Sequence, residues 1–511
     1  MNFQSLYRSL IFCGVLWMCG GVWGSAVAGE PKQGGTLRMA DTTGILNFDG
    51  HKLPEGNYPM LPQVYNTLMR LEEGTRQAEL AESWSFSKDG LTLELKLREG
   101  VKFHNGRELV SDDVVWNIRR VQDPKTAATA MPLSRTIKSA EVGDKYRVIV
   151  RLEKPTPAVL DLFDIMWIIP KEAEADIQKM GIGTGPFQVV QWVPGDRVIF
   201  KKFPDYFRKG LPYLDGVILQ RMPDSPAMIV NLEAGALDLA YRIPPRDAAR
   251  LMKDRKDILV KSTPVANVEE IIINVSKAPF DNKKVRQAIN HAVDRKRFVD
   301  TVLVGFGEPM CQALPPQSAG FSRDLGNQHC AFDLAQAKQL LAEAGYPDGF
   351  ASELHISTAT YPESRQLAQI LQADLAKIGV RLTIRDLEPA DFRETYFGGA
   401  KGKFAMVIHQ YSRTNRDPDT LYRTTVAWNP RGGLSTFGLP EYASLVDDAG
   451  STMDPAKRRQ LYDQIAHYVA DQAFVLPITP IVMLMAIGPT VQGVENNVDG
   501  MPILEKAWLT R

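Results

Sequence analysis

Residues 181–240 hold the pattern that most restricts how this chain can fold. Two β-prone runs, 187–192 and 197–203, flank Pro194-Gly195-Asp196. Pro fixes φ, Gly tolerates a positive φ and Asp hydrogen-bonds to its own backbone, so this pattern predicts a β-hairpin. The stretch continues with a strand at 217–221, a helix with Pro226 in its first turn, and a short apolar strand at 237–241. The order of these elements indicates a mixed α/β unit.

Several distinct short motifs follow one another along the chain. Residues 181–240 contain Gly183-Thr184-Gly185-Pro186-Phe187, Pro204-Asp205-Tyr206, Pro212-Tyr213-Leu214-Asp215 and Glu233-Ala234-Gly235-Ala236-Leu237-Asp238. Elsewhere the chain has residues 97–106 followed by Ser111-Asp112-Asp113-Val114, and Val285-Arg286-Gln287-Ala288-Ile289-Asn290 followed by Asp294-Arg295 and Gly307-Glu308-Pro309. In residue sequence and in order, these motifs resemble those of the family 5 solute-binding proteins, the receptors of peptide and nickel ABC importers.

The resemblance covers essentially all of the mature chain and implies its fold. That fold is α/β: a two-lobed, type II-like periplasmic-binding-protein fold with mixed sheets, a hinge of crossing strands near 266–275 and 474–482, and an extra subdomain. The expected limits are 29–59, 176–268 and 478–511 for lobe I, 60–175 for its extra subdomain, and 269–477 for lobe II.

The local patterns agree with this arrangement. Ser111 is expected to cap a helix, with acidic residues in the first turn and arginines in the last. After residue 274 helical patterns alternate with strands, which favours βα units and a mostly parallel sheet. Residues 404–411 are nearly continuously apolar, as a strand covered on both faces should be.

Residues 1–28 are typical of a secretory signal peptide. Arg8 is their only charge, an apolar run covers residues 10–22, and Ala26-Val27-Ala28 is an A-x-A cleavage site. The alternative, a membrane anchor, is disfavoured because the run falls short of the ~20 residues that a spanning helix needs. Lipid anchoring is also disfavoured, because Cys13 and Cys19 follow large residues. A periplasmic location is therefore expected.

Charge and cysteine content narrow the function further. Without residues 1–28 the chain has 59 basic and 60 acidic residues, which gives no case for nucleic-acid binding. Cys311 and Cys330 are the two cysteines left after cleavage. An exported compartment favours a disulfide between them, although two free thiols remain the alternative that sequence leaves open.

Enzyme motifs are absent from the sequence. There is no G-x-S-x-G, H-E-x-x-H or Walker A run. The histidines are scattered, so a zinc site would have to assemble by folding alone, and no cofactor or metal is expected. His409 is the one histidine with a place close to the expected cleft.

The segment 409–423 is the expected ligand-binding region, because it leaves the end of a central strand, where open α/β sheets bind ligands. The candidate ligand contacts are Tyr411, Arg413, Thr414, Asn415, Arg416, Asp417 and, further along, Trp428. Peptide-binding members of the resembling family have Trp seven residues before the Pro of this segment and, four residues before it, an Asp that pairs with the peptide ammonium. Tyr411 and Thr414 occupy these positions here, so an aromatic ring is kept and the carboxylate is lost.

Arginines replace that carboxylate in the same segment. Arg413, Arg416 and Arg423 suit a carboxylate, a phosphate or sugar oxygens and repel an ammonium group. A pairing of these arginines with Asp417 and Asp419, or their solvation, fits the sequence equally well. Trp428 has two interpretations, ring stacking on a ligand and burial as a core anchor.

The resemblance implies a periplasmic, monomeric, non-enzymatic substrate-binding component of an ABC importer. It would capture a peptide or peptide-like solute by hinge closure and deliver it to membrane permease subunits. The alternatives are a receptor for an anionic opine-like compound, an oligosaccharide or a metal chelate, and, from a different class, a secreted hydrolase.

Overall fold

The computed structural model describes residues 30–511, with gaps at 53–56, 73, 317, 362, 398–402, 413–415, 426–427 and 432–439. The expected signal peptide, residues 1–28, lies outside the described residues. Within the described part, no helix combines the length and the apolar character that a membrane crossing requires.

Lobe I contains the predicted hairpin. Its two strands pair antiparallel from Phe187 opposite Lys202 to Val193 opposite Arg197, and Gly195 in the turn has a φ of +78°. Strand β1 lies between β10 and β11 and is parallel to both. Together with the antiparallel hairpin, this gives the mixed sheet that was expected. The elements of lobe I are β1 (Thr36–Asp41), α1 (Leu61–Val64), β8 (Phe187–Val193), β9 (Arg197–Lys202), β10 (Gly216–Arg221), α5 (Ser225–Glu233), β11 (Leu239–Tyr241), α6 (Pro245–Asp254), β17 (Val491–Gln492), β18 (Glu495–Asn496), β19 (Pro502–Ile503) and β20 (Trp508–Leu509).

The extra subdomain has its own sheet and its own hydrophobic core. Four antiparallel strands follow the order β4-β5-β7-β6, helix α2 packs against them, and the core residues come from Leu68 to Ile168. Its elements are β2 (Met69–Glu72), β3 (Thr75–Ala78), β4 (Ala81–Phe86), β5 (Thr92–Leu97), α2 (Ser111–Gln122), η2 (Pro124–Thr126), α3 (Met131–Ser134), β6 (Ile137–Asp144), β7 (Arg147–Leu152), η3 (Pro157–Val159), α4 (Leu160–Ile165) and η4 (Lys171–Ala173).

The predicted cap of α2 is wrong by one residue. Val110 is the N-cap residue, and its backbone N–H donates to the Asp113 carboxylate over 3.1 Å. The hydroxyl of Ser111 donates instead to the carbonyl oxygen of Asp144 in β6. The acidic first turn and the arginines of the last turn lie where the sequence predicts them.

Lobe II consists of βα units. Strand β13 pairs in parallel with β14 and β15, and helices pack on both faces of the sheet. Its elements are α7 (Lys283–His291), α8 (Arg295–Thr301), η5 (Gln328–Cys330), α9 (Leu334–Glu343), β13 (Ala351–Ile356), α10 (Ser364–Ala376), β14 (Arg381–Asp386), α11 (Pro389–Phe397), β15 (Met406–Ser412), α12 (Pro418–Thr424), α13 (Pro440–Ser451) and α14 (Pro455–Gln472). In β15, Met406 and Ile408 face one core and Val407 and Tyr411 the other, so this strand is covered on both faces as predicted.

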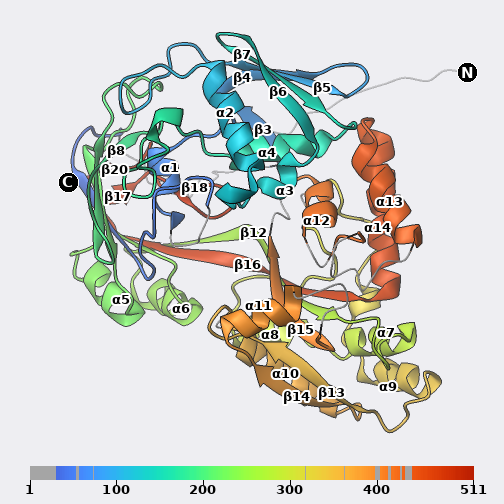
Figure 1. Ribbon diagram of the computed structural model, residues 1–511. Coiled ribbons are helices and arrows are strands. Elements are labelled where there is room, and N and C mark those ends of the chain that lie inside the picture. Colours follow the sequence, from blue (N-terminus) through green and yellow to red (C-terminus); the bar gives the residue numbers. More distant parts are fainter. Residues whose placement is uncertain are drawn as a thin grey trace, which may run out of the picture.

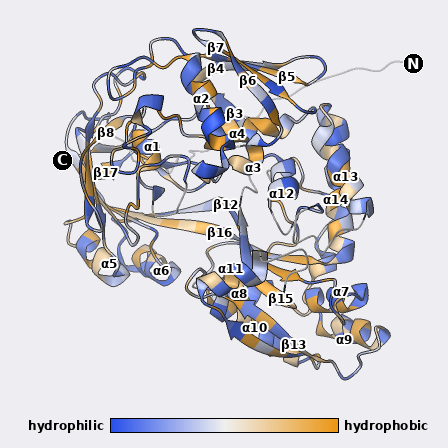
Figure 2. Cartoon of the chain, in the orientation of Figure 1, coloured by the Kyte–Doolittle hydropathy of each residue, from blue (hydrophilic) through white to orange (hydrophobic). Residues whose placement is uncertain are grey.

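Two long strands connect the lobes. β12 (Leu259–Ile273) and β16 (Val475–Ile487) are antiparallel partners that run from lobe I into lobe II (Figure 1), and Figure 2 shows β16 as a mainly hydrophobic strand. They lie inside one ten-stranded sheet of order β14-β13-β15-β12-β16-β11-β1-β10-β9-β8. Their ladder is irregular between Pro264 and Glu270, where proline lacks an N–H to donate. The predicted fold class, two lobes joined by crossing strands with an extra subdomain, is confirmed.

Candidate functional site between the lobes

The expected ligand-binding segment runs from the end of β15 into α12. Asp417 is the N-cap residue of α12, and its side chain accepts a hydrogen bond of 2.9 Å from the backbone N–H of Asp419. Pro418 occupies the first turn, where its missing N–H costs nothing. The Asp-Pro-Asp sequence is therefore a helix start that positions this face of lobe II. Three candidate contacts, Arg413, Thr414 and Asn415, lie outside the described residues.

Tyr411 and Trp428 belong to the core of lobe II and do not line a cleft. Their side chains are 2% and 0% exposed, and their rings meet edge to face at 5.6 Å. The Tyr411 hydroxyl donates to the carbonyl oxygen of Ala313, and the Trp428 indole N–H donates to Glu270 over 3.1 Å. Because each polar atom has an internal partner, both rings can be buried, which corrects the expectation that they wall the ligand site.

His409 is also buried, facing Glu270 from the neighbouring strand. Its Nδ1 lies 3.2 Å from the Glu270 carboxyl, and its ring stacks on Tyr396 with centroids 4.2 Å apart. Burial lowers the pKa of His409 to about 3 and raises the pKa of Glu270 well above its ordinary value. His409 is therefore neutral near pH 7, burial disfavours the charged form of Glu270, and the imidazole faces Glu270 inside lobe II.

Arg416 joins lobe II to the other half of the molecule. Its Nε donates to Asp164 of α4 over 2.9 Å, and Nη1 and Nη2 each donate to Asp499 over 2.8 Å. The Arg416 and Asp164 side chains are 3% and 1% exposed. The expected ligand arginine is thus occupied by carboxylates of the protein. We refer to Arg416, Asp164 and Asp499 as the interlobe latch.

A second set of contacts lies beside the latch. Asp161 of α4 accepts a hydrogen bond of 3.0 Å from the backbone N–H of Asp417 and another from the Thr420 hydroxyl, and it also pairs with Arg76 of β3. Burial raises the pKa of Asp164 to about 6, with the Arg416 guanidinium acting in the opposite direction. The interlobe face is therefore built from charged and polar groups that the closed arrangement removes from water.

The other acids and the other arginine of the segment that the structure describes pair within lobe II. Both carboxylate oxygens of Asp417 accept from Arg458 of α14, and Nε of Arg423 lies 2.6 Å from Asp419. The sequence left open that the arginines of this segment pair with Asp417 and Asp419. Arg423 does pair with Asp419. Asp417 is held by its helix and by Arg458, which corrects its assignment as a ligand contact.

A cavity of about 440 Å³ lies between the subdomain and α12. Small-molecule sites usually enclose roughly 300–1,000 Å³, so this space is large enough for a small solute. Its lining includes Arg135, Lys154 and Thr156 of the subdomain, and Asp419, Thr420 and Arg423 of lobe II. The predicted segment thus contributes to an interlobe cavity. It does so through Asp419, Thr420 and Arg423, which follow the expected contact Asp417 along the chain.

The residues that face the segment from the opposite side were not among the predicted site residues. They include Asp161, Asp164 and Asp499. Asp161 and Asp164 stand in the otherwise apolar helix α4, three residues apart and therefore on one face. Two acids in such a helix are a signal for buried partners. Asp499, Arg135 and Lys154 carry no comparable signal, since single charges in loops and at strand ends are common.

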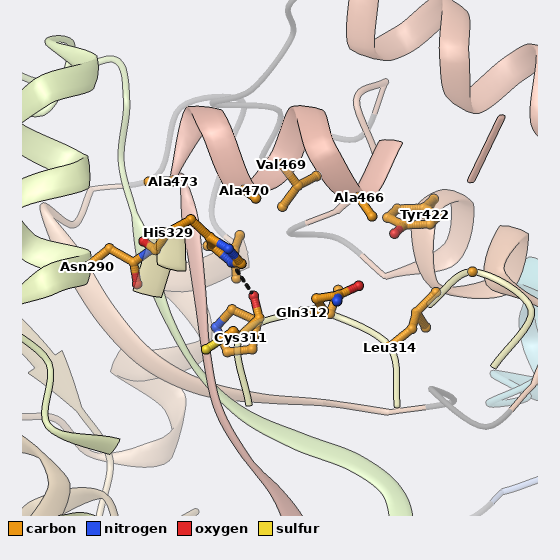
Figure 3. Close-up of a pocket in the computed structure, with 14 residues that line it drawn as sticks. Asn290, Cys311, Gln312, Leu314, His329, Tyr422, Ala466, Val469, Ala470 and Ala473 are labelled. Carbon is orange, nitrogen blue, oxygen red and sulfur yellow. Dashed lines mark hydrogen bonds between the residues drawn. The ribbon is translucent and has the colours of Figure 1, made fainter. Parts of the chain in front are cut away.

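Cys311 and Cys330 form a disulfide with their Cα atoms 5.8 Å apart. It closes a loop of lobe II that packs near α14 (Figure 3) around a small cavity of about 20 Å³. His329 and the Cys311 carbonyl oxygen are joined by a 2.9 Å hydrogen bond across this loop.

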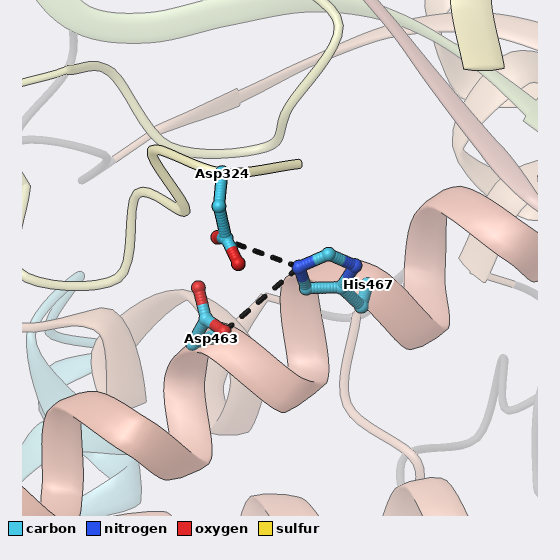
Figure 4. A group of neighbouring side chains, drawn as sticks. All are labelled: Asp324, Asp463 and His467. Atoms are coloured by element: carbon cyan, nitrogen blue, oxygen red, sulfur yellow. Dashed lines mark ion pairs between the residues drawn. The ribbon is translucent and has the colours of Figure 1, made fainter. Parts of the chain in front are cut away.

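One cluster with metal-binding residue types occurs among the described residues. His467 and Asp463, one turn apart on α14, face Asp324 of the disulfide-closed loop (Figure 4). Nε2 of His467 lies 3.5 Å from Asp324 and 3.9 Å from Asp463. All three side chains are substantially exposed, so the contacts are those of a surface charge cluster.

Comparisons with known proteins agree with the fold. The sequence profile of the Bacterial extracellular solute-binding proteins, family 5 Middle, matches residues 75–433. Heme-binding protein A of Haemophilus influenzae is 32% identical over 466 residues, which cover 84% of each chain. The dipeptide-binding protein of Escherichia coli is 31% identical over 467 residues, covering 84% of this chain and 86% of its own length.

A solved structure gives the same result. The periplasmic binding protein DppA of Helicobacter pylori, in complex with the peptide STSA, superposes with a TM-score of 0.78 at 25% identity, over 94% of this chain and 99% of its own. The Helicobacter protein is an ABC transporter-associated periplasmic binding protein. The chain belongs to the bacterial extracellular solute-binding proteins, family 5.

Proposed function

We propose that this protein is the substrate receptor of an ABC importer and that its solute is a peptide or a peptide-like small molecule. Its relatives include a dipeptide-binding protein and a receptor solved with a bound peptide. The observation that carries the proposal is the polar interlobe face around Arg416. Ion pairs and hydrogen bonds can be exchanged for water when two lobes part, whereas a shared hydrophobic core would hold the lobes together.

In this proposal, closure is driven by contacts made to both lobes at once. The latch and the Asp161 contacts form only in the closed arrangement, and the solute adds contacts to the same face. Residues 413–415 are the proposed solute-contacting part of lobe II. The hinge expected near 266–275 and 474–482 overlaps the part of the β12–β16 ladder that is irregular between Pro264 and Glu270.

Cellular location and partners complete the proposal. The protein is exported by its signal peptide, works as a monomer in the periplasm and delivers its solute to membrane permease subunits. It acts without chemical conversion, because binding and release require no nucleophile or general base. No nucleic acid takes part.

Native mass spectrometry of the purified mature protein tests this function. We expect an adduct of peptide size that is lost on partial unfolding, and a saturable rise in melting temperature when di- to pentapeptides are added. The Arg413→Ala variant should bind these peptides more weakly. A protein that carries no solute and responds to no peptide would contradict the receptor proposal, and cleaved peptides in the mixture would show a hydrolase instead.

A further inference from the structure

The cavity between the subdomain and α12 contains an excess of positive charge. Arg135 and Lys154 line it from the subdomain, and neither forms an ion pair with a carboxylate among the described residues. Arg423 also lines it but is balanced by Asp419, which is the one acid among its described lining residues. Two exposed cations without an ion pair among the described residues thus line one partly open cavity.

The electrostatics of Lys154 agree with this geometry. Burial lowers the pKa of Lys154 below its ordinary value, and the nearby Arg423 guanidinium lowers it further. Asp447 and Asp419 act in the opposite direction without reversing the shift. An anion placed in the cavity would restore the preference of Lys154 for its charged form.

We propose that this cavity is a recognition site for a carboxylate group of the solute, bound by Arg135 and Lys154. Arginine offers a planar pair of N–H donors and lysine a compact charge, a combination that suits a carboxylate. The inference rests on the proposed receptor function and narrows it to solutes that present an acidic group to the subdomain. Neutral and cationic solutes of equal size bind less well.

The first experiment probes the cavity without reference to the solute. The full mature protein is labelled with a small amine-acylating reagent, with and without glutarate, and labelling of each lysine is read by peptide mass spectrometry. We expect glutarate to reduce labelling of Lys154 at least threefold while labelling of Lys138, an exposed lysine of β6 outside the cavity, stays constant. In the Arg135→Gln variant this protection should be lost. Unchanged labelling of Lys154 overturns the proposal.

The second experiment measures selectivity by calorimetry with alanyl-alanine and its C-terminal amide, two solutes of nearly equal size of which only the first has a carboxylate. We expect alanyl-alanine to bind about tenfold more tightly. Lys154→Met and Arg135→Gln should reduce this preference to about twofold or less, whereas Lys138→Met should leave the preference intact. The substituted side chains are exposed, and their melting temperatures check that the variants fold.

The two experiments separate this inference from the function on which it rests. If alanyl-alanine and its amide bind equally and glutarate protects nothing, the receptor function stands and the carboxylate site is refuted. If glutarate protects Lys154 but neither alanyl-alanine nor its amide binds, the carboxylate site is supported and the peptide assignment fails.

Discussion

Removal of the Arg416 guanidinium should weaken solute binding because it destabilises the closed state. Arg416 itself contacts Asp164 and Asp499 and not the solute. The Arg416→Met variant keeps most of the side-chain volume and leaves Asp164, which is 1% exposed, without its cation. Breaking a buried ion pair by removing one partner costs about 3–5 kcal/mol. We take the lower end, about 3 kcal/mol, because Asp499 is 23% exposed and can be solvated again.

This cost falls on the closed state alone, because the latch residues of an open molecule are in water. Solute binding that requires closure then loses about 3 kcal/mol, or about 100-fold in affinity. The loss should shrink as pH falls. The pKa of the buried Asp164 is about 6 beside Arg416 and rises further without that cation, so the acid of the variant takes up a proton and no longer needs a partner. Calorimetry measures the affinity, and small-angle scattering measures how compact the unliganded protein is.

Two further variants make the measurement specific. Arg416→Met combined with Asp164→Asn removes both charges of the buried pair and should recover part of the affinity. Lys296→Met breaks an exposed pair with Asp300 and should change affinity by less than twofold. An affinity within threefold of the parent for Arg416→Met, with unchanged scattering, would show that the latch does not hold the lobes closed.

Three further predictions concern stability. Burial raises the pKa of Glu269 from 4.5 to about 8, so the folded state binds a proton that the unfolded state releases, and stability should fall by up to about 5 kcal/mol as pH rises from 4.5 to 8. Glu269→Gln should remove this slope in denaturant titrations at several pH values. Reduction of the Cys311–Cys330 disulfide, whose cysteines are 19 residues apart, should lower the free energy of unfolding by about 3 kcal/mol. Trp428→Phe leaves the Glu270 carboxyl without its indole donor and should lower the free energy of unfolding by about 2 kcal/mol. Solute affinity should change little. A large loss of affinity would show that Trp428 contacts the solute.

The elements that depend on local chemistry could be predicted well. The hairpin around Gly195 follows from a turn that needs a residue tolerant of positive φ, and β15 follows from a run of apolar residues long enough to be covered on both faces. The start of α2 was misplaced by one residue, because a valine can be the N-cap residue when a carboxylate three positions later supplies the hydrogen bond. Patterns of residue type report the presence of a helix better than its first residue.

The sequence alone determined the fold class, the order of the elements and the segment that meets the opposite lobe, because these follow from hydrophobic periodicity and from motifs that lie close together in the chain. Only the tertiary structure decided what each polar residue of that segment contacts. Arg416 reaches Asp164 and Asp499, which are 252 and 83 positions away in the chain, and Tyr411 turns into the core because Ala313 offers a carbonyl oxygen there. A charged or aromatic side chain has the same local pattern whether its partner is a ligand, a distant carboxylate or water, so its partner is set by which surfaces the fold brings together.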